Sequence, residues 1–538
     1  MENIRKDVQV ILDWCKDNTL PLNEQKTKLM MFTNRKNVPK PDLFINGNKI
    51  EWVSEMKYLG VTLDSSLNFN SHIKKTVRKA NIVMAQCKKT YGKTWGLSPK
   101  ICNWMYKSLI LPILSYASPI WIKSAFNKKN MDLLERVQRR ACLAITNGMK
   151  STPTAGMEIL LDIRPIDIYL KETALKSYHR MLRNKNWRVQ EAEILNKNSH
   201  AVILRKMAQN VKIIYEESDV LKESHFIESH FETDIGLRKD LQNKKIRFTN
   251  LDDNVINVFT DGSKTNDGVG CAYVIRGKKF TKRGTFGLND KHSVFQAEVL
   301  AIIKACEHLK TLNIEDKIIK FYIDSQAAIK AIDKYSIKSA LALRAKIVVN
   351  EVSAKNIVIL KWIPSHVGTS MNFGNELVDK LAKQGTTKPD KVKLPFSNNV
   401  FYNEIEKWSL KMHEKRWANS TDCRQTKMTC PKVNRKVTKF ILKMSRKKMM
   451  YATQILTGHA SLGYHLKNMK IIQSDICEKC GFESETVDHF VRKCPFYFRQ
   501  RWEIFKEFKM KQDLHKYSFM KIMKFVTRTK RLKIEDEN

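Results

Sequence analysis

The sequence predicts an α/β domain over residues 252–388, within a chain of 538 residues that is otherwise mainly α-helical. Short β-rich runs alternate with helical segments in this stretch, which is the pattern of α/β structure. One of these runs, Ile318–Ile323, is nearly all apolar, as expected of a strand buried in a parallel sheet. The segments on either side show helical periodicity instead.

The chain is too long for one hydrophobic core, and we expect three or four domains. Residues 1–90 mix a short helix with strands, and residues 91–250 are expected to be helical. The α/β domain at 252–388 is followed by a basic helical region at 389–475. A Cys/His motif at 476–500 then precedes a basic tail at 501–538.

The charge of the chain points to its partner. There are 97 Lys and Arg residues against 55 Asp and Glu residues, a formal net charge of +42. Such an excess argues for a polyanion, with nucleic acid as the first candidate and Lys-rich composition without a role as the alternative. Between Lys432 and Lys448 there are eight basic residues and no acid. This run is either a solvated helix face or a surface that follows phosphates.

No segment suggests a membrane partner. The N-terminus is charged and lacks an apolar signal sequence. The longest apolar stretch, Ser108–Ile122, is shorter than the roughly 20 residues that a membrane-spanning helix needs. We therefore expect an intracellular protein, nuclear or cytoplasmic, whose eleven cysteines are reduced and partly metal-bound rather than paired in disulfides.

Three strands are expected to open the α/β domain as an antiparallel meander: Val255–Thr260, Gly270–Ile275 and Lys278–Phe286. The first is expected to end at Asp261, in the sequence VFTDGSK. An acid followed by glycine is typical of a short hairpin turn. The alternative is a functional site, because sites in open α/β sheets assemble at strand ends.

Two further acids favour the functional site. An amphipathic helix is expected at Val294–Lys310, and Glu298 lies within its apolar stripe, where a carboxylate is costly unless paired or metal-bound. The strand Ile318–Ile323 ends at Asp324. If its strand neighbours that of Asp261, three carboxylates meet, and a hard cation such as Mg²⁺ or Mn²⁺ would relieve their repulsion.

A fourth acid follows in WIPSHVGTSMNFGNELVDKLAK, which we interpret as a strand end, a loop with His366 and Gly368, and a helix. Asn375 and Asp379 are four residues apart and share one edge of this helix, beside its apolar face. Asp379 is therefore expected to reach the other acids.

These residues resemble the type 1 ribonuclease H family. The matching motifs, in family order, are DGS at 261–263, QAE at 296–298, DSQ at 324–326 and HVG…GNELVD at 366–379. The resemblance implies a ribonuclease H-like fold, with a five-stranded mixed sheet and flanking helices. It also implies an enzyme that hydrolyses the RNA strand of RNA–DNA hybrids endonucleolytically with two Mg²⁺ or Mn²⁺ ions.

The resemblance also implies roles for individual residues. The metal ligands would be Asp261, Glu298, Asp324 and Asp379. His366 would assist proton transfer or product departure, and Gly262 and Gln326 would contact the RNA strand. The stretch from His366 to Asp379 is three residues longer than the family form, with TSMNF in place of a shorter link. The alternative function is therefore an inactive remnant that binds nucleic acid without cutting it.

The flanking segments resemble the end of the reverse transcriptase and the connector of jockey-like non-LTR retrotransposons. The similar stretches are WCKDNTLPLNEQKTKLMMF, MKYLGVTLD, LILPILSYASPIW, STPTAGMEILLDIRPIDIYL and LTGHASLGYHL. The resemblance implies that residues 1–90 are a thumb-like remnant and that the polymerase site is missing. A reverse transcriptase palm carries an aromatic-x-Asp-Asp turn, whereas Asp252 and Asp253 follow Asn250 and Leu251.

A last motif has the spacing of a metal site. Cys477, Cys480, His489 and Cys494 follow the pattern Cys-x2-Cys-x8-His-x4-Cys. Three thiolates and one imidazole suit tetrahedral Zn²⁺. The alternative is a cluster of reduced cysteines that is stabilised by packing alone.

Overall fold

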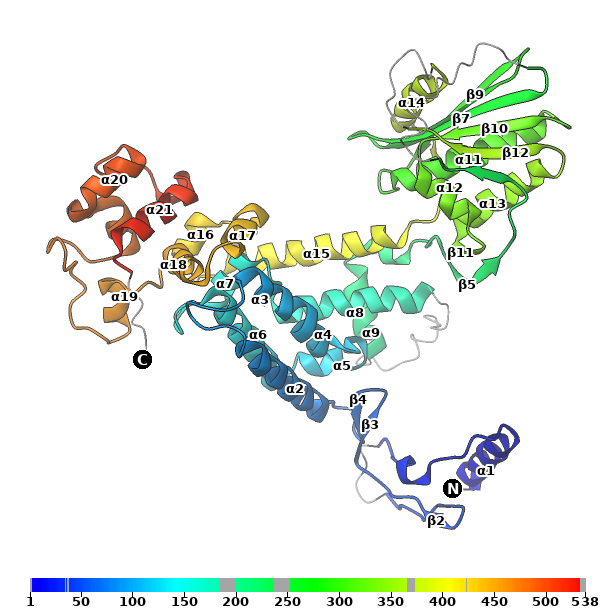
Figure 1. Cartoon of the computed structure of the whole chain (residues 1–538). Coiled ribbons are helices and arrows are strands. Elements are labelled where there is room, and N and C mark those ends of the chain that lie inside the picture. Colours follow the sequence, from blue (N-terminus) through cyan, green and yellow to red (C-terminus); the bar gives the residue numbers. More distant parts are fainter. Residues whose placement is uncertain are drawn as a thin grey trace. The chain divides into compact units, whose positions relative to one another are not determined.

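The computed structural model describes residues 2–33, 35, 38–183, 200–236, 252–364, 373–421 and 423–532 (Figure 1). The chain divides into two compact units, and each is considered by itself. The first comprises Met1–Leu175, Asn196–Arg205 and Lys407–Asn538, and the second comprises Lys176–Leu195 and Lys206–Glu406.

A seven-stranded mixed sheet forms the centre of the second unit, in the order β13-β9-β8-β7-β10-β12-β6. The predicted meander is present as β7 (Val255–Lys264), β8 (Val269–Arg276) and β9 (Thr281–Leu288), which pair antiparallel. The predicted parallel strand is β10 (Ile318–Ile323), and it pairs with β7 on one side.

The other side of the sheet is also parallel. β12 (Ile357–Trp362) pairs with β10, and the short β6 (Glu232–Asp234) pairs with β12. At the opposite edge, β13 (Lys391–Val392) pairs parallel with β9. The predicted mixed sheet is thus confirmed, and one short strand extends it at each edge.

The prediction that the first strand ends at Asp261 is wrong. β7 continues to Lys264, because β8 pairs with it up to that residue, with Asp261 opposite Ala272. The parallel partner strand, β10, stops pairing with β7 earlier, because their last residue pair is Thr260 with Ile323. The acid followed by glycine therefore lies inside a strand and does not form a hairpin turn.

Helices cover both faces of this sheet (Figure 1). Those on one face are α11 (Val294–Thr311), α12 (Gln326–Asp333) and α13 (Ala340–Ser353), and that on the other face is α14 (Phe373–Thr386). The adjacent residues Val258 and Phe259 of β7 belong to the two different cores. This follows from the alternation of side chains along a strand.

Strands also occur where the sequence predicted only helix. After the helical turn η4 (Lys212–Tyr215), β5 (Val220–Phe226) pairs antiparallel with β11 (Ser336–Ser339). With β6, it contradicts the helical assignment of residues 91–250, part of which lies outside the described residues. The strands form because their hydrogen-bonding partners lie more than a hundred residues further along the chain, where local periodicity gives no sign of them.

The first unit is mostly helical. Its helices are α1 (Glu2–Asp17), α2 (Asn70–Lys88), α3 (Pro99–Met105), α4 (Leu111–Ser115), α5 (Ser118–Ala125), α6 (Lys128–Thr146), α7 (Thr154–Leu161), α16 (Arg424–Thr429), α17 (Arg435–Leu442), α18 (Arg446–Thr457), α19 (Gly463–Asn468), α20 (Phe498–Phe505) and α21 (Phe519–Thr529). α8 (Ile166–Arg183), α9 (His200–Gln209) and α15 (Asn398–Asn419) have residues in both units.

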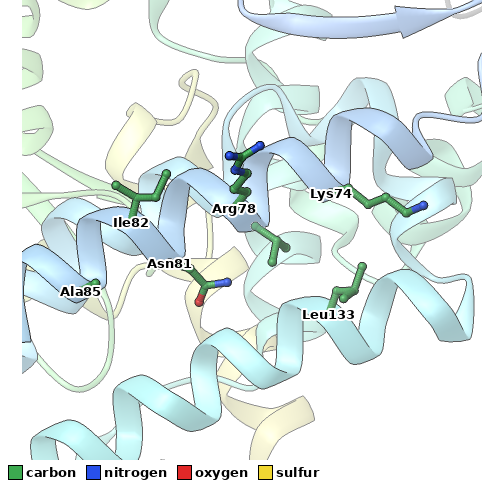
Figure 2. Close-up of a pocket in the computed structure, with 7 residues that line it drawn as sticks. Lys74, Arg78, Asn81, Ile82, Ala85 and Leu133 are labelled. Carbon is green, nitrogen blue, oxygen red and sulfur yellow. The ribbon is translucent and has the colours of Figure 1, made fainter.

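Shorter elements complete this unit. The helical turns are η1 (Glu24–Lys26), η2 (Tyr106–Ile110), η5 (His489–Lys493), η6 (Pro495–Tyr497) and η7 (Leu514–Lys516). The antiparallel strand pairs are β1 (Phe44–Ile45) with β2 (Asn48–Lys49) and β3 (Glu55–Tyr58) with β4 (Val61–Asp64). A groove of about 430 Å³ lies between α2 and α6, lined by residues that include Lys74, Arg78 and Leu133 (Figure 2).

The apolar stretch 108–122 forms part of η2, α4 and α5, and none of the described helices is both long and apolar enough to cross a membrane. All eleven cysteines are free of disulfide bonds.

The basic run from Lys432 to Lys448 lies on α17 and at the start of α18. Seven of its basic side chains are exposed, but Arg446 is buried. Its guanidinium lies 4.6 Å from the centre of the Tyr91 ring and donates a hydrogen bond to the carbonyl oxygen of Ala144 at 2.9 Å. Arg446 therefore holds segments of the first unit together, and only the other seven can follow phosphates.

Candidate active site and zinc centre

Three predicted acids meet at the end of the parallel strands. Asp261 and Asp324 follow the paired residues Thr260 and Ile323, so they lie side by side where β7 and β10 stop pairing. Glu298 comes from α11, which packs on β7. One carboxylate oxygen from each of the three lies within 4.8 Å of the others. The tertiary structure thus brings together acids that are up to 63 positions apart in the chain (324 − 261 = 63).

The donor atoms in this cluster fit a cation. The exposed fraction is 7% for Asp261 and 3% for Glu298. Within the described part of the chain, Asp261 Oδ2 and Glu298 Oε2 are buried and accept no hydrogen bond. Unpaired buried carboxylate oxygens are costly, and hard divalent cations such as Mg²⁺ take oxygen ligands of this kind.

Burial and mutual repulsion perturb both groups. Burial raises the pKa of Asp261 to about 7, the charges of Asp324 and Asp379 add to the rise, and a hydrogen bond from the Gly262 backbone opposes it. Burial and the same neighbouring aspartate, Asp324, raise the pKa of Glu298 well above its usual value. A bound divalent cation would reverse this balance by favouring the ionised carboxylates.

Asp379 lies near the cluster but outside its tightest group. It is half-buried on α14, and its charge contributes to the raised pKa of Asp261. Lys383, one helical turn further on, donates a hydrogen bond to Asp379 Oδ2 at 2.6 Å. This lysine is not among the residues predicted from the sequence, although its i,i+4 spacing from an acid would have indicated it.

Gly262 allows the helix and the strand to approach each other. A Cβ atom at this position would lie 2.6 Å from the backbone nitrogen of Glu298 and 2.9 Å from Ala297 Cβ. Any side chain would therefore push α11, and Glu298 with it, away from Asp261. This packing role accounts for a glycine here without any substrate contact.

Two residues lie beside Asp324. Trp362, the last residue of β12, donates a hydrogen bond from Nε1 to the backbone oxygen of Asp324 at 3.0 Å and fixes this strand end. No sequence motif pointed to this tryptophan. Gln326 is the first residue of α12 and is half-buried. His366, to which the sequence assigns an assisting role, lies outside the described residues.

The predicted zinc ligands also converge, in the first unit. One ligand atom from each of Cys477, Cys480, His489 and Cys494 lies within 4.8 Å of the others. Cys477 Sγ is 3.9 Å from Cys494 Sγ, and Cys480 Sγ is 3.3 Å from His489 Nε2. Tetrahedral zinc, with bonds of about 2.3 Å to sulfur and about 2.0 Å to nitrogen, separates two sulfurs by about 3.8 Å and a sulfur from a nitrogen by about 3.5 Å. Both distances therefore fit tetrahedral zinc, and all four atoms lie close enough to share one ion.

The surroundings of this group orient its ligands. His489 Nδ1 lies 3.1 Å from Glu483 Oε2, so a carboxylate can hold the ring with Nε2 facing the thiols. Carboxylate partners of this kind fix the tautomer of zinc-binding histidines. Gly481, whose φ is +71°, closes the turn after Cys480 by donating its N–H to the carbonyl oxygen of Cys477 at 2.7 Å. Glu483 was not predicted from the sequence, because the spacing motif identifies the ligands alone.

Comparison with protein families supports the identification of the α/β domain. A family model described as RNase H matches residues 253–387. Among solved structures, the chain is similar to RNase H1 from the archaeon Halobacterium salinarum NRC-1 (18% identity, TM-score 0.20, covering 24% of this chain and 96% of the other). It is also similar to LC11-RNase H1 in complex with RNA/DNA hybrid (19% identity, TM-score 0.20, covering 24% and 97%).

Curated relatives come from mobile elements. The Pol polyprotein from the type-1 retrotransposable element R1 of Bradysia coprophila is 25% identical over 174 residues, which are 32% of this chain and 17% of the relative. Its counterpart from Nasonia vitripennis is 23% identical over 207 residues, 37% of this chain and 61% of the relative. The RNA-directed DNA polymerase from the mobile element jockey of Drosophila melanogaster is 26% identical over 174 residues, 31% and 18%.

The chain thus spans less than two thirds of the length of each of these relatives. The predicted resemblances to ribonuclease H and to non-LTR retrotransposon proteins are both confirmed. Residues 253–387 are a ribonuclease H domain, a domain of hydrolases, in a chain that is similar to the Pol polyproteins of R1 and jockey-type non-LTR retrotransposons.

Proposed function

We propose that residues 252–388 hydrolyse the RNA strand of RNA–DNA hybrids by endonucleolytic cleavage. The observation that carries this proposal is the cluster of Asp261, Glu298 and Asp324, with two buried carboxylate oxygens that accept no hydrogen bond from the described residues. A domain core does not gain stability from such a group, whereas a metal-dependent nuclease requires it.

The four acids would hold two divalent ions. Asp261, Glu298 and Asp324 offer oxygens close enough to share a cation, and Asp379 lies on the neighbouring α14. Two bound divalent ions would supply an activated water and would stabilise the leaving oxygen at a phosphate. Lys383 holds the Asp379 carboxylate until an ion competes for it. Burial keeps the cluster compact, since Asp261 and Glu298 are nearly inaccessible to solvent.

Selection of the RNA strand would depend on residues beside the acids. Gly262 and Gln326 are the positions at which the family resemblance implies RNA contact, and both lie close to a clustered acid in the chain. Recognition of RNA depends on 2′-hydroxyl groups in a wide, shallow minor groove, which hydrogen-bonding groups on a flat surface can reach. His366 would assist proton transfer or product departure, as the resemblance implies.

The rest of the chain would bind nucleic acid. The seven exposed basic residues between Lys432 and Lys448 are suited to phosphate contacts, and the Cys/His group would hold one Zn²⁺. We also propose that this chain does not polymerise DNA. Asp253 forms an ion pair with Lys278 at 2.7 Å, with both side chains more than half exposed, and the Asp252-Asp253 pair lies in neither of the two potential metal-binding groups of the described residues. Primer extension on an RNA template with Mg²⁺ or Mn²⁺ tests this exclusion.

A cleavage assay tests the main proposal. The purified chain is incubated with an end-labelled RNA–DNA hybrid, and with the matching RNA and DNA duplexes, in the presence of Mg²⁺ or of EDTA. Internal cuts in the RNA of the hybrid alone, only with the metal, are expected. Binding of the hybrid without cleavage would favour the alternative, an inactive remnant that binds nucleic acid. The longer stretch from His366 to Asp379 is the reason for considering this alternative.

A further inference from the structure

The first unit contains a cavity of about 810 Å³ that neither the acids nor the zinc ligands form. Four separate segments line it: the loop before α7, α16, the stretch from the end of α18 through α19, and the residues around Glu485. Part of its lining comes from the sequence LTGHASLGYHL, which lies outside the ribonuclease H domain and has no part in the proposed cleavage. This volume is in the range of small-molecule binding sites, which is roughly 300–1,000 Å³.

One wall carries a compact polar group. Ser151 Oγ lies 2.9 Å from His465 Nε2 and 3.4 Å from His459 Nδ1. The two imidazole rings are 4.6 Å apart between centres. Because the hydroxyl engages one nitrogen of each ring, the remaining nitrogens, His459 Nε2 and His465 Nδ1, are left for other partners. The lining adds the guanidinium of Arg424 and the amides of Gln425 and Asn468.

The fold holds this group in place from both sides. α18 ends at Gly458, whose φ is +77°, and this left-handed turn carries the chain out of the helix just before His459. On the other side, Arg139 donates hydrogen bonds to the carbonyl oxygen of Thr152 at 2.9 Å and to Thr154 Oγ1 at 2.8 Å, which fixes the loop that bears Ser151. The wall is therefore preorganised for a ligand.

The electrostatics of the lining favour an anion. Its two acids are already neutralised: Glu485 is 1% exposed and accepts two hydrogen bonds from Arg531, and Asp488 pairs with Arg492 and Lys493. Arg424 is exposed and forms no ion pair with any described residue. The lining thus presents one unneutralised cation, Arg424, beside one free imidazole N–H and the amide N–H groups of Gln425 and Asn468, all of which can donate to phosphate oxygens.

Three further lining residues are apolar or aromatic and exposed. The exposed fraction is 48% for Tyr464, 50% for Met428 and 40% for Met469. Exposed aromatic and thioether side chains next to phosphate-binding groups suit the flat face of a nucleobase, because a base stacks on an aromatic ring whatever its identity.

Among the described residues, the serine and histidines lack the group that would orient a catalytic histidine. In hydrolases with an activated serine, a third group orients the histidine, usually a carboxylate on its other nitrogen. No carboxylate among the described residues bonds to either imidazole. The group is therefore arranged to bind and not to attack.

We propose that this cavity binds one nucleotide of a single-stranded nucleic acid, with its phosphate against Arg424 and the histidine pair that Ser151 joins and with its base against Tyr464. The site lies in the first unit, and because stacking on Tyr464 uses the face of a base and needs no partner strand, it would take an unpaired end or loop. It does not depend on cleavage activity.

Calorimetric titration of the full zinc-loaded chain tests the proposal. The probe is adenosine monophosphate at moderate salt, because a mononucleotide cannot span the basic surface of the chain. Adenosine and inorganic phosphate are titrated separately, because each contains only one part of adenosine monophosphate. Saturable binding of adenosine monophosphate, at least ten times tighter than that of either half, is expected.

Two exposed positions allow variants that leave the fold intact. Arg424→Gln and Tyr464→Ala should each weaken binding of adenosine monophosphate about tenfold or more. Lys524→Gln, which removes an exposed charge from α21 outside the cavity, should leave it unchanged. Equal binding by Arg424→Gln and wild type, or binding of inorganic phosphate as tight as that of the nucleotide, would overturn the proposal. So would the absence of any saturable binding.

A second readout locates the ligand. Ser151→Ala should lower the affinity for adenosine monophosphate, and NMR of ¹³C-labelled histidine should show shifts of His459 and His465 on titration, with assignment by His459→Gln. Shifts confined to the other histidines would place the ligand elsewhere and refute the site.

Discussion

Asp261 and Asp324 lie side by side where two parallel strands stop pairing, each directly after the last residue pair, Thr260 with Ile323, that joins β7 to β10. Glu298 reaches the same point from α11, and one oxygen from each of the three acids lies within 4.8 Å of the others. Like charges held this close destabilise the metal-free protein, and a divalent cation removes the conflict. The first two predictions follow from this relationship.

Asp324→Asn is expected to abolish cleavage of an RNA–DNA hybrid, by a factor of about a hundred or more, because an amide is a weaker ligand for a hard cation. Hybrid binding should survive, and the metal-free variant should be at least as stable as wild type, since one repulsive charge is gone. Single-turnover cleavage, hybrid titration and thermal unfolding measure the three quantities. Asp267→Asn, on an exposed turn of the same domain, is the matched control. Cleavage by Asp324→Asn at the wild-type rate would rule out this residue as a ligand.

The metal-free domain is expected to lose stability as pH rises from about 4 to about 7. Burial raises the folded-state pKa of Asp261 from 3.8 to about 7, so in this interval the folded chain retains a proton that the unfolded chain has released. The free energy of unfolding therefore falls with pH, by about 2–4 kcal/mol over the interval. Mg²⁺ should restore the loss near pH 7.5 and have little effect near pH 5.

Denaturant unfolding in EDTA and in Mg²⁺ at both pH values measures this effect. Asp261→Asn is the control, because it removes one titrating group while the buried Glu298 of the same domain remains. The variant should show a flatter pH profile and a smaller response to Mg²⁺. An unchanged profile would mean that another group carries the pH dependence.

Gly262→Ala is expected to destabilise the domain by about 1–3 kcal/mol and to lower cleavage. The new Cβ would lie 2.6 Å from the backbone nitrogen of Glu298, and backbone atoms cannot move aside as a flexible side chain can. The helix would shift and move the Glu298 carboxylate away from its partners. Ser263→Ala, the next residue of β7, is the control. Wild-type stability and activity in Gly262→Ala would show that α11 and β7 are not this tightly packed.

The Cys/His group is expected to hold one zinc ion per chain, measured by elemental analysis of protein prepared without added metal. Cys480→Ser combined with Cys494→Ser should abolish the zinc content. Glu483→Gln should weaken zinc binding by about 10–100-fold in a chelator competition, because the histidine loses the carboxylate that orients it. Glu478→Gln, exposed in the same loop, should behave as wild type. Wild-type zinc content in the double cysteine variant would refute the assignment.

Hybrid binding is expected to weaken steeply with salt, because each phosphate that the protein neutralises releases condensed counterions. Lys436→Gln combined with Lys439→Gln, both exposed on α17, should reduce the slope of log affinity against log salt by about one for each phosphate that is no longer neutralised. Lys524→Gln is again the control. Identical slopes for the double variant and wild type would show that α17 is not part of the binding surface.

The sequence by itself determined the local elements and the chemistry of the two sites. Ile318–Ile323 is a strand with the predicted bounds, and the predicted helix Val294–Lys310 differs from α11 by one residue. The position of Glu298 in the apolar stripe and the spacing of the cysteines and histidine follow from periodicity and covalent spacing, which are properties of neighbouring residues.

Only the tertiary structure decided what depends on distant partners. Asp261 lies inside β7 because β8 continues to pair with β7 beyond the last residue pair of β7 with β10. No local sequence pattern reveals that the antiparallel pairing extends further than the parallel one. β6 is a strand because the edge of β12 supplies its hydrogen bonds. The group of Ser151, His459 and His465 joins residues more than 300 positions apart, through contacts that local sequence patterns do not encode. The physical reason is the same in each case: backbone pairing and cavity walls are made between segments, and their energy depends on which segments meet.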